Sequence, residues 1–264
     1  MKHFLRVMLI SITIFFLTTI AALYVLQDSM IFPSPATRGA VYQENGFRPV
    51  SIHTPDGESL ASFYRPPETI QPTILVFHGN GDAAAYQQSK ANQLAKSGFG
   101  VLLVEYRGYG GSSGVPSESG LYIDGMAAYD FVRQQSSQPI GLYAHSLGSG
   151  VAVLLATKRK IFALVLESPF DSLMAVAKRR FPWVPVSLLL KHKFQSDLLI
   201  GKIDAPILLI HGSDDRVIPI GHGKKLAEKA PFNTRFEEIA GAGHNNLQQF
   251  GSVDMAVEFF KSTE

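Results

Sequence analysis

The sequence lacks cysteine altogether and carries little net charge. Among its 264 residues there is no cysteine, which excludes disulfide bonds, thiolate zinc sites, iron–sulfur clusters and a cysteine nucleophile. The 24 lysines and arginines nearly balance the 22 acidic residues, so the formal net charge is +2. This balance gives no basic field for nucleic acid, and we expect no nucleic-acid partner. The hydrophobic content of 46% excludes a disordered chain and fits one globular domain with a short extra segment.

A long uncharged stretch lies near the N-terminus. Residues 7–26 contain no charged side chain, and Lys2 and Arg6 precede them. A helix of this length is about 30 Å long, which matches the hydrocarbon core of a bilayer. Residues 1–30 are therefore predicted to form a single-pass transmembrane anchor. A cleaved signal peptide is the alternative, and a buried core helix is less favoured because the stretch is apolar all round.

The flanking charges predict the orientation of this anchor. Basic residues before the apolar run favour a cytoplasmic N-terminus, with the rest of the chain on the other side of the membrane. No asparagine stands in an N-x-S/T sequence, which a glycosylated luminal domain would often contain. We therefore expect a bacterial inner membrane protein whose domain faces the periplasm.

The remaining chain has the pattern of an α/β fold. Residues 50–64 alternate in polarity around a turn at 55–57, which predicts a hairpin. Short apolar segments then alternate with helically spaced ones. The predicted strands cover residues 73–77, 100–105, 140–144, 162–167, 205–210 and 234–239, and the predicted helices cover 83–97, 121–134, 147–158, 222–229 and 252–261. Strands that are apolar throughout indicate a mostly parallel sheet with helices on both faces. We assign residues 35–264 to this single domain.

One serine follows a predicted strand in a manner typical of a nucleophile. Ser146 comes after the strand 140–144, between the small residues Ala144 and Gly148. A nucleophile on a sharp strand-to-helix turn needs small neighbours at these two positions, because the strained backbone brings them close together. The usual pattern is G-x-S-x-G, from which Ala144 departs. The alternative is that Ser146 caps the following helix.

Other loops supply candidate partners for this serine. Residues 78–82, His-Gly-Asn-Gly-Asp, follow the strand 73–77, and an N–H of Asn80 together with that of Leu147 could hold an oxyanion. A tight turn with polar caps is the alternative for that loop. Asp214 and Asp215 follow the strand 205–210, and His244 lies in a glycine-flanked loop after the last strand. A carboxylate that orients a histidine, and a histidine that acts as general base, complete the order Ser…Asp…His.

At these positions the sequence resembles the serine α/β-hydrolases, and it is most similar to membrane-anchored α/β-hydrolase domain proteins of the Bem46-like type. The matching segments are LVFHGNG (75–81), EYRGYGGSSG (105–114), YAHSLGSG (143–150), ESPFDSL (167–173), HGSDDRVIP (211–219) and GAGHNN (241–246). The resemblance implies an α/β-hydrolase fold with Ser146 as nucleophile, His244 as base and Asp215 as acid. Asp214 and Asp171 stay open as alternative acids.

The segment 172–200 interrupts the alternation of strands and helices, and we expect a short helical lid over about 169–203. It combines apolar side chains, among them Phe181 and Trp183, with five basic residues: Lys178, Arg179, Arg180, Lys191 and Lys193. Such a lid suits an acyl chain or an anionic membrane surface. Ordinary amphipathic helices packed on the core are the alternative. The predicted substrate-binding residues are His78, Gly79, Tyr109, Phe181 and Trp183.

These observations predict a membrane-anchored serine hydrolase that cleaves carboxylic esters or thioesters of a small molecule or an acyl lipid. The reaction would pass through an acyl-enzyme, and we expect it to need no metal ion and no cofactor. A serine peptidase or amidase on the same fold is one alternative. A non-catalytic binding protein on this fold is another, because fold alone does not define function. The oligomeric state is left open.

Overall fold

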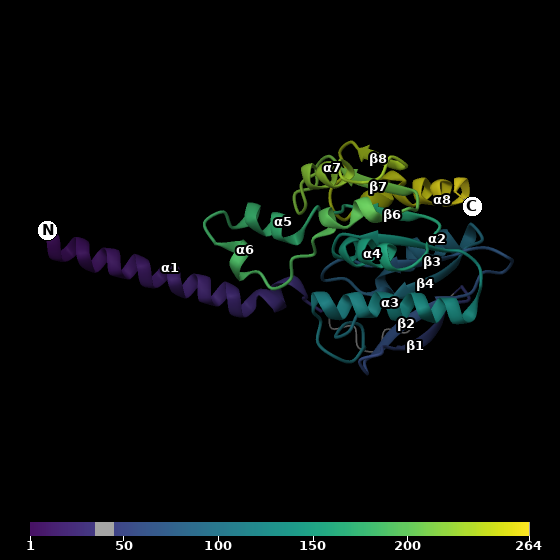
Figure 1. The fold of residues 1–264 in the computed structure, drawn as a ribbon, viewed down its shortest axis with the longest axis horizontal. Coiled ribbons are helices and arrows are strands. Elements are labelled where there is room, and N and C mark those ends of the chain that lie inside the picture. Colours follow the sequence, from purple (N-terminus) through teal and green to yellow (C-terminus); the bar gives the residue numbers. More distant parts are fainter. Residues whose placement is uncertain (35–44, 264) are drawn as a thin grey trace.

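The computed structural model describes residues 1–34 and 45–263. In this part of the chain, eight strands form one sheet in the order β1-β2-β4-β3-β5-β6-β7-β8 (Figure 1). They are β1 (Arg48–His53), β2 (Ser59–Arg65), β3 (Thr73–Phe77), β4 (Gly100–Val104), β5 (Ile140–His145), β6 (Leu164–Glu167), β7 (Ile207–Gly212) and β8 (Thr234–Ile239). The β1–β2 and β2–β4 pairs are antiparallel, and all other pairs are parallel. The predicted mostly parallel sheet with an N-terminal hairpin is confirmed.

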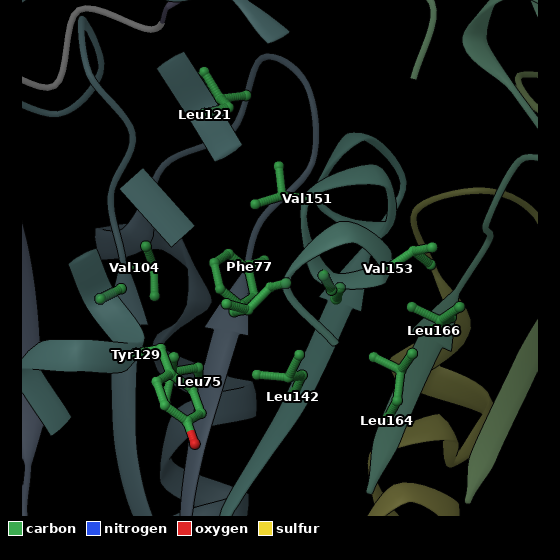
Figure 2. Close-up of a cluster of buried hydrophobic side chains, with 14 of the residues drawn as sticks. Leu75, Phe77, Val104, Leu121, Tyr129, Leu142, Val151, Val153, Leu164 and Leu166 are labelled. Carbon is green, nitrogen blue, oxygen red and sulfur yellow. The ribbon is translucent and has the colours of Figure 1, made fainter. Parts of the chain in front are cut away.

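Helices cover both faces of the sheet. They are α2 (Gln88–Lys96), α3 (Glu118–Gln135), α4 (Leu147–Lys158), α7 (Gly221–Ala227) and α8 (Ser252–Ser262). Side chains of β3 alternate between two cores because successive strand residues point to opposite faces. Leu75 and Phe77 pack in the core under α3 and α4, whereas Ile74 and Val76 pack in the core under α2 and α8. Figure 2 shows the first core, in which Phe77 lies beside Val151 of α4 and Leu75 lies beside Tyr129 of α3.

The helix predicted over residues 83–97 is divided in two. A 3₁₀ turn, Ala84–Gln87, precedes α2. The backbone N–H of Ala84 donates to the Glu105 carboxylate at 3.1 Å, and that of Ala83 donates to Asp82 at 2.8 Å. These side-chain acceptors satisfy the first N–H groups and hold the turn against β4.

The N-terminal helix α1 (Lys2–Ile31) projects from the domain as a long rod (Figure 1). It is long and apolar enough to cross a membrane, by length and composition. Its side chains are largely exposed; Phe4 and Phe15, for example, are 70% and 73% exposed. The predicted start of the domain at residue 35 lies outside the described residues.

The predicted lid forms α5 (Leu173–Arg180), α6 (Val186–Leu189) and two short 3₁₀ turns, Ser196–Leu198 and Ile200–Lys202. Its helices lie beside the C-terminal part of α1 (Figure 1), and the side-chain amide of Gln27 donates to the carbonyl of Leu189 at 3.3 Å. The lid is therefore in contact with the N-terminal helix as well as with the domain.

Candidate active site

Ser146 occupies a strained turn between β5 and α4. Its φ and ψ are 51° and −115°, a conformation that residues other than glycine rarely adopt. A Cβ on Gly148 would lie 2.6 Å from the carbonyl oxygen of Phe77, and Ala144 is fully buried. Small residues at both positions are therefore needed for this turn. The Ser146 side chain makes no capping bond to α4, so the helix-cap interpretation does not describe its contacts.

The Ser146 hydroxyl meets the His244 imidazole. The distance from Ser146 Oγ to His244 Nε2 is 2.9 Å, and His244 Nδ1 lies 2.7 Å from Asp215 Oδ2. When Nδ1–H donates to the carboxylate, Nε2 is free to accept the hydroxyl proton. The three residues follow β5, β7 and β8, so one edge of the sheet brings them together from distant parts of the sequence.

Asp215 is held as a carboxylate. Burial alone would raise the pKa of Asp215, but hydrogen bonds from His211 and His244 and from the N–H of Ile218 outweigh it and hold the pKa well below its usual range. The second carboxylate oxygen accepts from the N–H groups of Val217 at 2.9 Å and Ile218 at 2.8 Å. A charge fixed in this way can orient His244 and stabilise its cation.

The two alternative acids point elsewhere. Asp214 is exposed and accepts a hydrogen bond from the Ser213 hydroxyl at 3.0 Å. Asp171 lies 2.7 Å from Nδ1 of His222, on α7. Of the three candidates, Asp215 is the one whose carboxylate reaches His244.

The loop after β3 lies directly beside Ser146. A Cβ added to Gly79 would come within 3.3 Å of the Ser146 Cβ and within 2.8 Å of His145 Nδ1, so only glycine allows this approach. Asn80 and Leu147 line the same cavity as Ser146. Leu147 begins α4, where the first N–H groups have no intrahelical acceptor. That the N–H groups of Asn80 and Leu147 form an oxyanion hole remains a proposal.

The cavity over Ser146 has a volume of about 770 Å³. Beside the serine it is polar, with Asn80 and Gln248 in its lining, and towards the lid it is apolar, with Leu173 and Val176. Residues of α1 also contribute to its wall: Met30 and Ile31. This size is typical of a site for a small organic molecule.

A buried ion pair at this cavity was not predicted. Lys90 Nζ lies 2.5 Å from Glu167 Oε2, and both side chains are less than a tenth exposed. Burial alone would raise the pKa of Glu167, but the charge and hydrogen bond of Lys90 outweigh it and lower the pKa to about 2. Lys90 lies on α2, whose many polar residues suggest a solvent-exposed helix. The spacing of residues in the sequence therefore does not indicate that Lys90 is buried. The position of Glu167 at the end of the predicted strand 162–167 was the one sign in the sequence that this residue lies near the site.

Two predicted substrate-binding residues do not line the cavity. His78 is fully buried and its Nε2 lies 2.7 Å from Glu105, while Tyr109 is fully buried with its ring 5.6 Å from that of His78. The glycine-rich segment after β4 packs Tyr106 and Tyr109 against His78 and against each other. Of the predicted pair His78 and Gly79, Gly79 lines the cavity.

The two lid aromatics face α1 rather than Ser146. The ring of Trp183 lies 5.9 Å from that of Phe16 and 6.4 Å from that of Phe181. Phe181 lines a separate groove between the lid and α1, and neither residue lines the cavity over Ser146. Neither side chain lies beside Ser146, and a role of the two residues in substrate binding stays a prediction.

The strand order, the covering helices and the strained serine turn define an α/β-hydrolase fold. Residues 68–200 match the family described as serine aminopeptidase, S33, and the chain belongs to this family of hydrolases within the α/β-hydrolase superfamily.

Relatives and solved structures agree with this membership. An uncharacterized protein of Mycobacterium tuberculosis is 38% identical over 204 residues, which cover 75% of this chain and 73% of the relative. Human protein ABHD12B is 36% identical over 73% of this chain and 61% of its own length. The zebrafish (Danio rerio) lysophosphatidylserine lipase ABHD12 is 32% identical over 62% of this chain and 48% of its length. The Pyrococcus furiosus esterase Pf2001 superposes with a TM-score of 0.73 at 20% identity, covering 87% of this chain and 96% of the esterase.

Proposed function

We propose that the protein is a membrane-anchored serine hydrolase that cleaves carboxylic esters or thioesters, with Ser146 as nucleophile, His244 as general base and Asp215 as the orienting acid. The observation that carries this proposal is the pair of hydrogen bonds from Ser146 to His244 and from His244 to Asp215, at 2.9 and 2.7 Å. Nucleophile and base in hydrogen-bond reach, with the base oriented by a third group, are the geometry that activates a serine.

The reaction would run in two halves. Ser146 Oγ attacks the carbonyl carbon while its proton moves to His244 Nε2, and the charge of Asp215 stabilises the resulting imidazolium. The N–H groups of Leu147 and Asn80 receive the oxyanion. When the tetrahedral intermediate collapses, the bond to the leaving oxygen or sulfur breaks, and His244 returns its proton to that atom. Water then attacks the acyl-enzyme by the same route and frees Ser146.

Ester cleavage is favoured over removal of amino acids from a peptide, although the family description names an aminopeptidase. An aminopeptidase needs an available carboxylate for the substrate ammonium group. Two acidic residues line the cavity in the described part of the chain, and both are engaged. Glu167 pairs with Lys90 at 2.5 Å, and Asp82 accepts from Gln87 and from the N–H of Ala83. A relative named a lysophosphatidylserine lipase supports a lipid ester as substrate.

The anchor and its orientation form the second part of the proposal. Helix α1 has the length and apolar composition of a membrane span, and its last residues reach the cavity. With Lys2 and Arg6 before the apolar run, the N-terminus would lie in the cytoplasm and the hydrolase domain, residues 35–264, on the periplasmic face of a bacterial inner membrane.

Labelling with a fluorophosphonate tests the nucleophile. We expect the wild-type protein to bind the reagent covalently at Ser146, and Ser146→Ala to lose the label. The matched control is Ser168→Ala, because Ser168 is also a buried serine with a positive φ, 45°, and its hydroxyl has no hydrogen-bond partner among the described residues. Absence of label on folded wild-type protein, or equal labelling of Ser146→Ala, would overturn the proposal.

A further inference from the structure

An apolar groove runs between α1 and the lid. It has a volume of about 220 Å³, with α1 as one wall and the lid as the other. Ile20 and Leu23 are among its α1 residues, and Ala177, Val184 and Leu189 are among its lid residues. A groove lined almost wholly by hydrocarbon side chains binds apolar matter in preference to water.

The groove adjoins the cavity over Ser146. Four apolar side chains line both hollows: Met30 and Ile31 at the end of α1, and Leu173 and Val176 in α5. The boundary between the groove and the cavity is therefore formed by apolar side chains, which an acyl chain could displace more readily than polar ones.

The outer part of the groove lies beside the apolar run of α1. Trp183 of the lid contacts Phe16 with ring centroids 5.9 Å apart, and Phe16 is about 16 Å along the helix from Gln27 at 1.5 Å per residue. The lid also exposes Leu188, at 84%. If α1 spans the bilayer, this side of the lid lies among acyl chains, and the groove opens into them.

Polar contacts fix the inner ends of the two walls to each other. The Gln27 side chain accepts from the N–H of Lys191 at 2.8 Å, and Asp28 pairs with Lys191 Nζ at 3.0 Å and with His192 Nε2 at 3.1 Å. These three polar contacts fix the position of α1 relative to the lid. Apolar contact alone would not define this position as closely.

We propose that this groove guides the acyl chain of a membrane lipid ester from the bilayer to Ser146, so that the lipid need not pass through water. The proposal rests on the serine-hydrolase function and on α1 as a membrane anchor. It specifies the substrate class as a lipid whose chain stays in the hydrocarbon while its ester bond reaches the nucleophile. An acyl chain that avoids water avoids the free-energy cost of hydrating its methylene groups.

Two fluorophosphonate reagents test the acyl-chain route through the groove separately from the reactivity of Ser146. An ethyl fluorophosphonate reaches Ser146 from water, whereas a hexadecyl fluorophosphonate dissolved in phosphatidylcholine vesicles that hold the protein must present its chain from the bilayer. Ala177→Trp fills the groove at a residue that does not line the cavity over Ser146. We expect it to slow labelling by the hexadecyl reagent about tenfold or more, and to change labelling by the ethyl reagent less than about twofold. The control Leu188→Trp places the same side chain on the exposed face of the lid, and we expect wild-type rates with both reagents.

Each remaining outcome has a defined meaning. Wild-type hexadecyl rates in Ala177→Trp, equal slowing in Leu188→Trp, or a wild-type protein labelled by the ethyl but not the hexadecyl reagent would each overturn the route and leave the serine mechanism intact. A folded wild-type protein that the ethyl reagent does not label would instead overturn the proposed function. If Ala177→Trp also loses ethyl labelling through misfolding, Leu23→Trp on the α1 wall, compared with Val25→Trp on the exposed side of α1, decides the question.

Discussion

The imidazole of His145 lies 3.0 Å, at its Nε2, from the backbone carbonyl oxygen of His244. Burial is the main cause that lowers the pKa of His145 to about 4, and the positive charge of Lys90 adds to it. His145 is therefore neutral at physiological pH, and its Nε2–H donates to the carbonyl of the loop that carries the proposed base. His145, the residue before the proposed nucleophile, thus positions the loop of the proposed base His244.

The burial of His145 predicts acid sensitivity of the fold. Because the pKa of His145 falls from 6.5 to about 4 on folding, the unfolded chain binds more protons between these pH values. Stability should be full above pH 6.5 and should fall by on the order of 3 kcal/mol as the pH drops towards 4. Denaturant unfolding across this range measures the slope. We expect His145→Gln to flatten it and His53→Gln, at an exposed histidine, to leave it unchanged. An unchanged slope in His145→Gln would contradict the assignment.

The buried pair of Lys90 and Glu167 predicts a second dependence on pH. The lowered pKa of Glu167, about 2, means that its charge contributes stability above its usual pKa of 4.5, and this contribution is lost as the pH falls from 4.5 towards 2. Glu167→Gln leaves the Lys90 charge buried without its partner and should cost about 3–5 kcal/mol at neutral pH. The exposed pair of Arg235 and Glu237 offers the control, since Glu237→Gln should change stability by less than about 0.5 kcal/mol. Similar unfolding midpoints for the two variants would refute the role of the buried pair.

Neighbouring aspartates provide a matched test of the acid. Asp215→Asn keeps the shape of the side chain but removes the charge that orients His244, and should lower kcat for p-nitrophenyl butyrate by about 10³-fold or more. Asp214→Asn makes the same chemical change one residue away, on an exposed side chain, and should stay within about twofold. Steady-state kinetics of both variants give the comparison, and an equal loss in the two would exclude Asp215 as the acid.

The single tryptophan reports on the lid. Trp183 is 49% exposed and contacts Phe16 of α1, so it should lie among acyl chains when α1 spans a bilayer. We expect lipids brominated along their chains to quench its fluorescence, and acrylamide in the water to quench it weakly. Strong quenching by acrylamide without quenching by the brominated lipids would place the lid outside the membrane.

Much of the fold could be predicted because each signal was local. The segments Thr73–Phe77 and Thr234–Ile239 and the helix Leu147–Lys158 have the predicted bounds, since apolar runs and helical spacing are properties of neighbouring residues. The rule that the ends of parallel strands share one edge predicted that Ser146, His244 and the pair Asp214 and Asp215 lie near one another. The choice of Asp215 between the two aspartates came from the resemblance to the α/β-hydrolases.

The contacts that escaped prediction depend on packing between distant segments. His78 and Tyr109 have the residue types of a binding site, yet both are fully buried against each other. The pairing of Lys90 with Glu167 joins residues 77 positions apart, and that of Asp28 with His192 joins residues 164 apart. No periodicity in the sequence encodes such pairs, because they are set by how helices and the lid dock on the sheet.

The central claim is that Ser146 carries the acyl group during turnover. Rapid acid quenching of the wild-type protein during hydrolysis of p-nitrophenyl butyrate, followed by mass spectrometry of its peptides, measures this directly. The account predicts a butyryl group on the peptide that contains Ser146, formed in an initial burst of p-nitrophenol. Turnover with no acyl group on Ser146, or with the group on another residue, would contradict it.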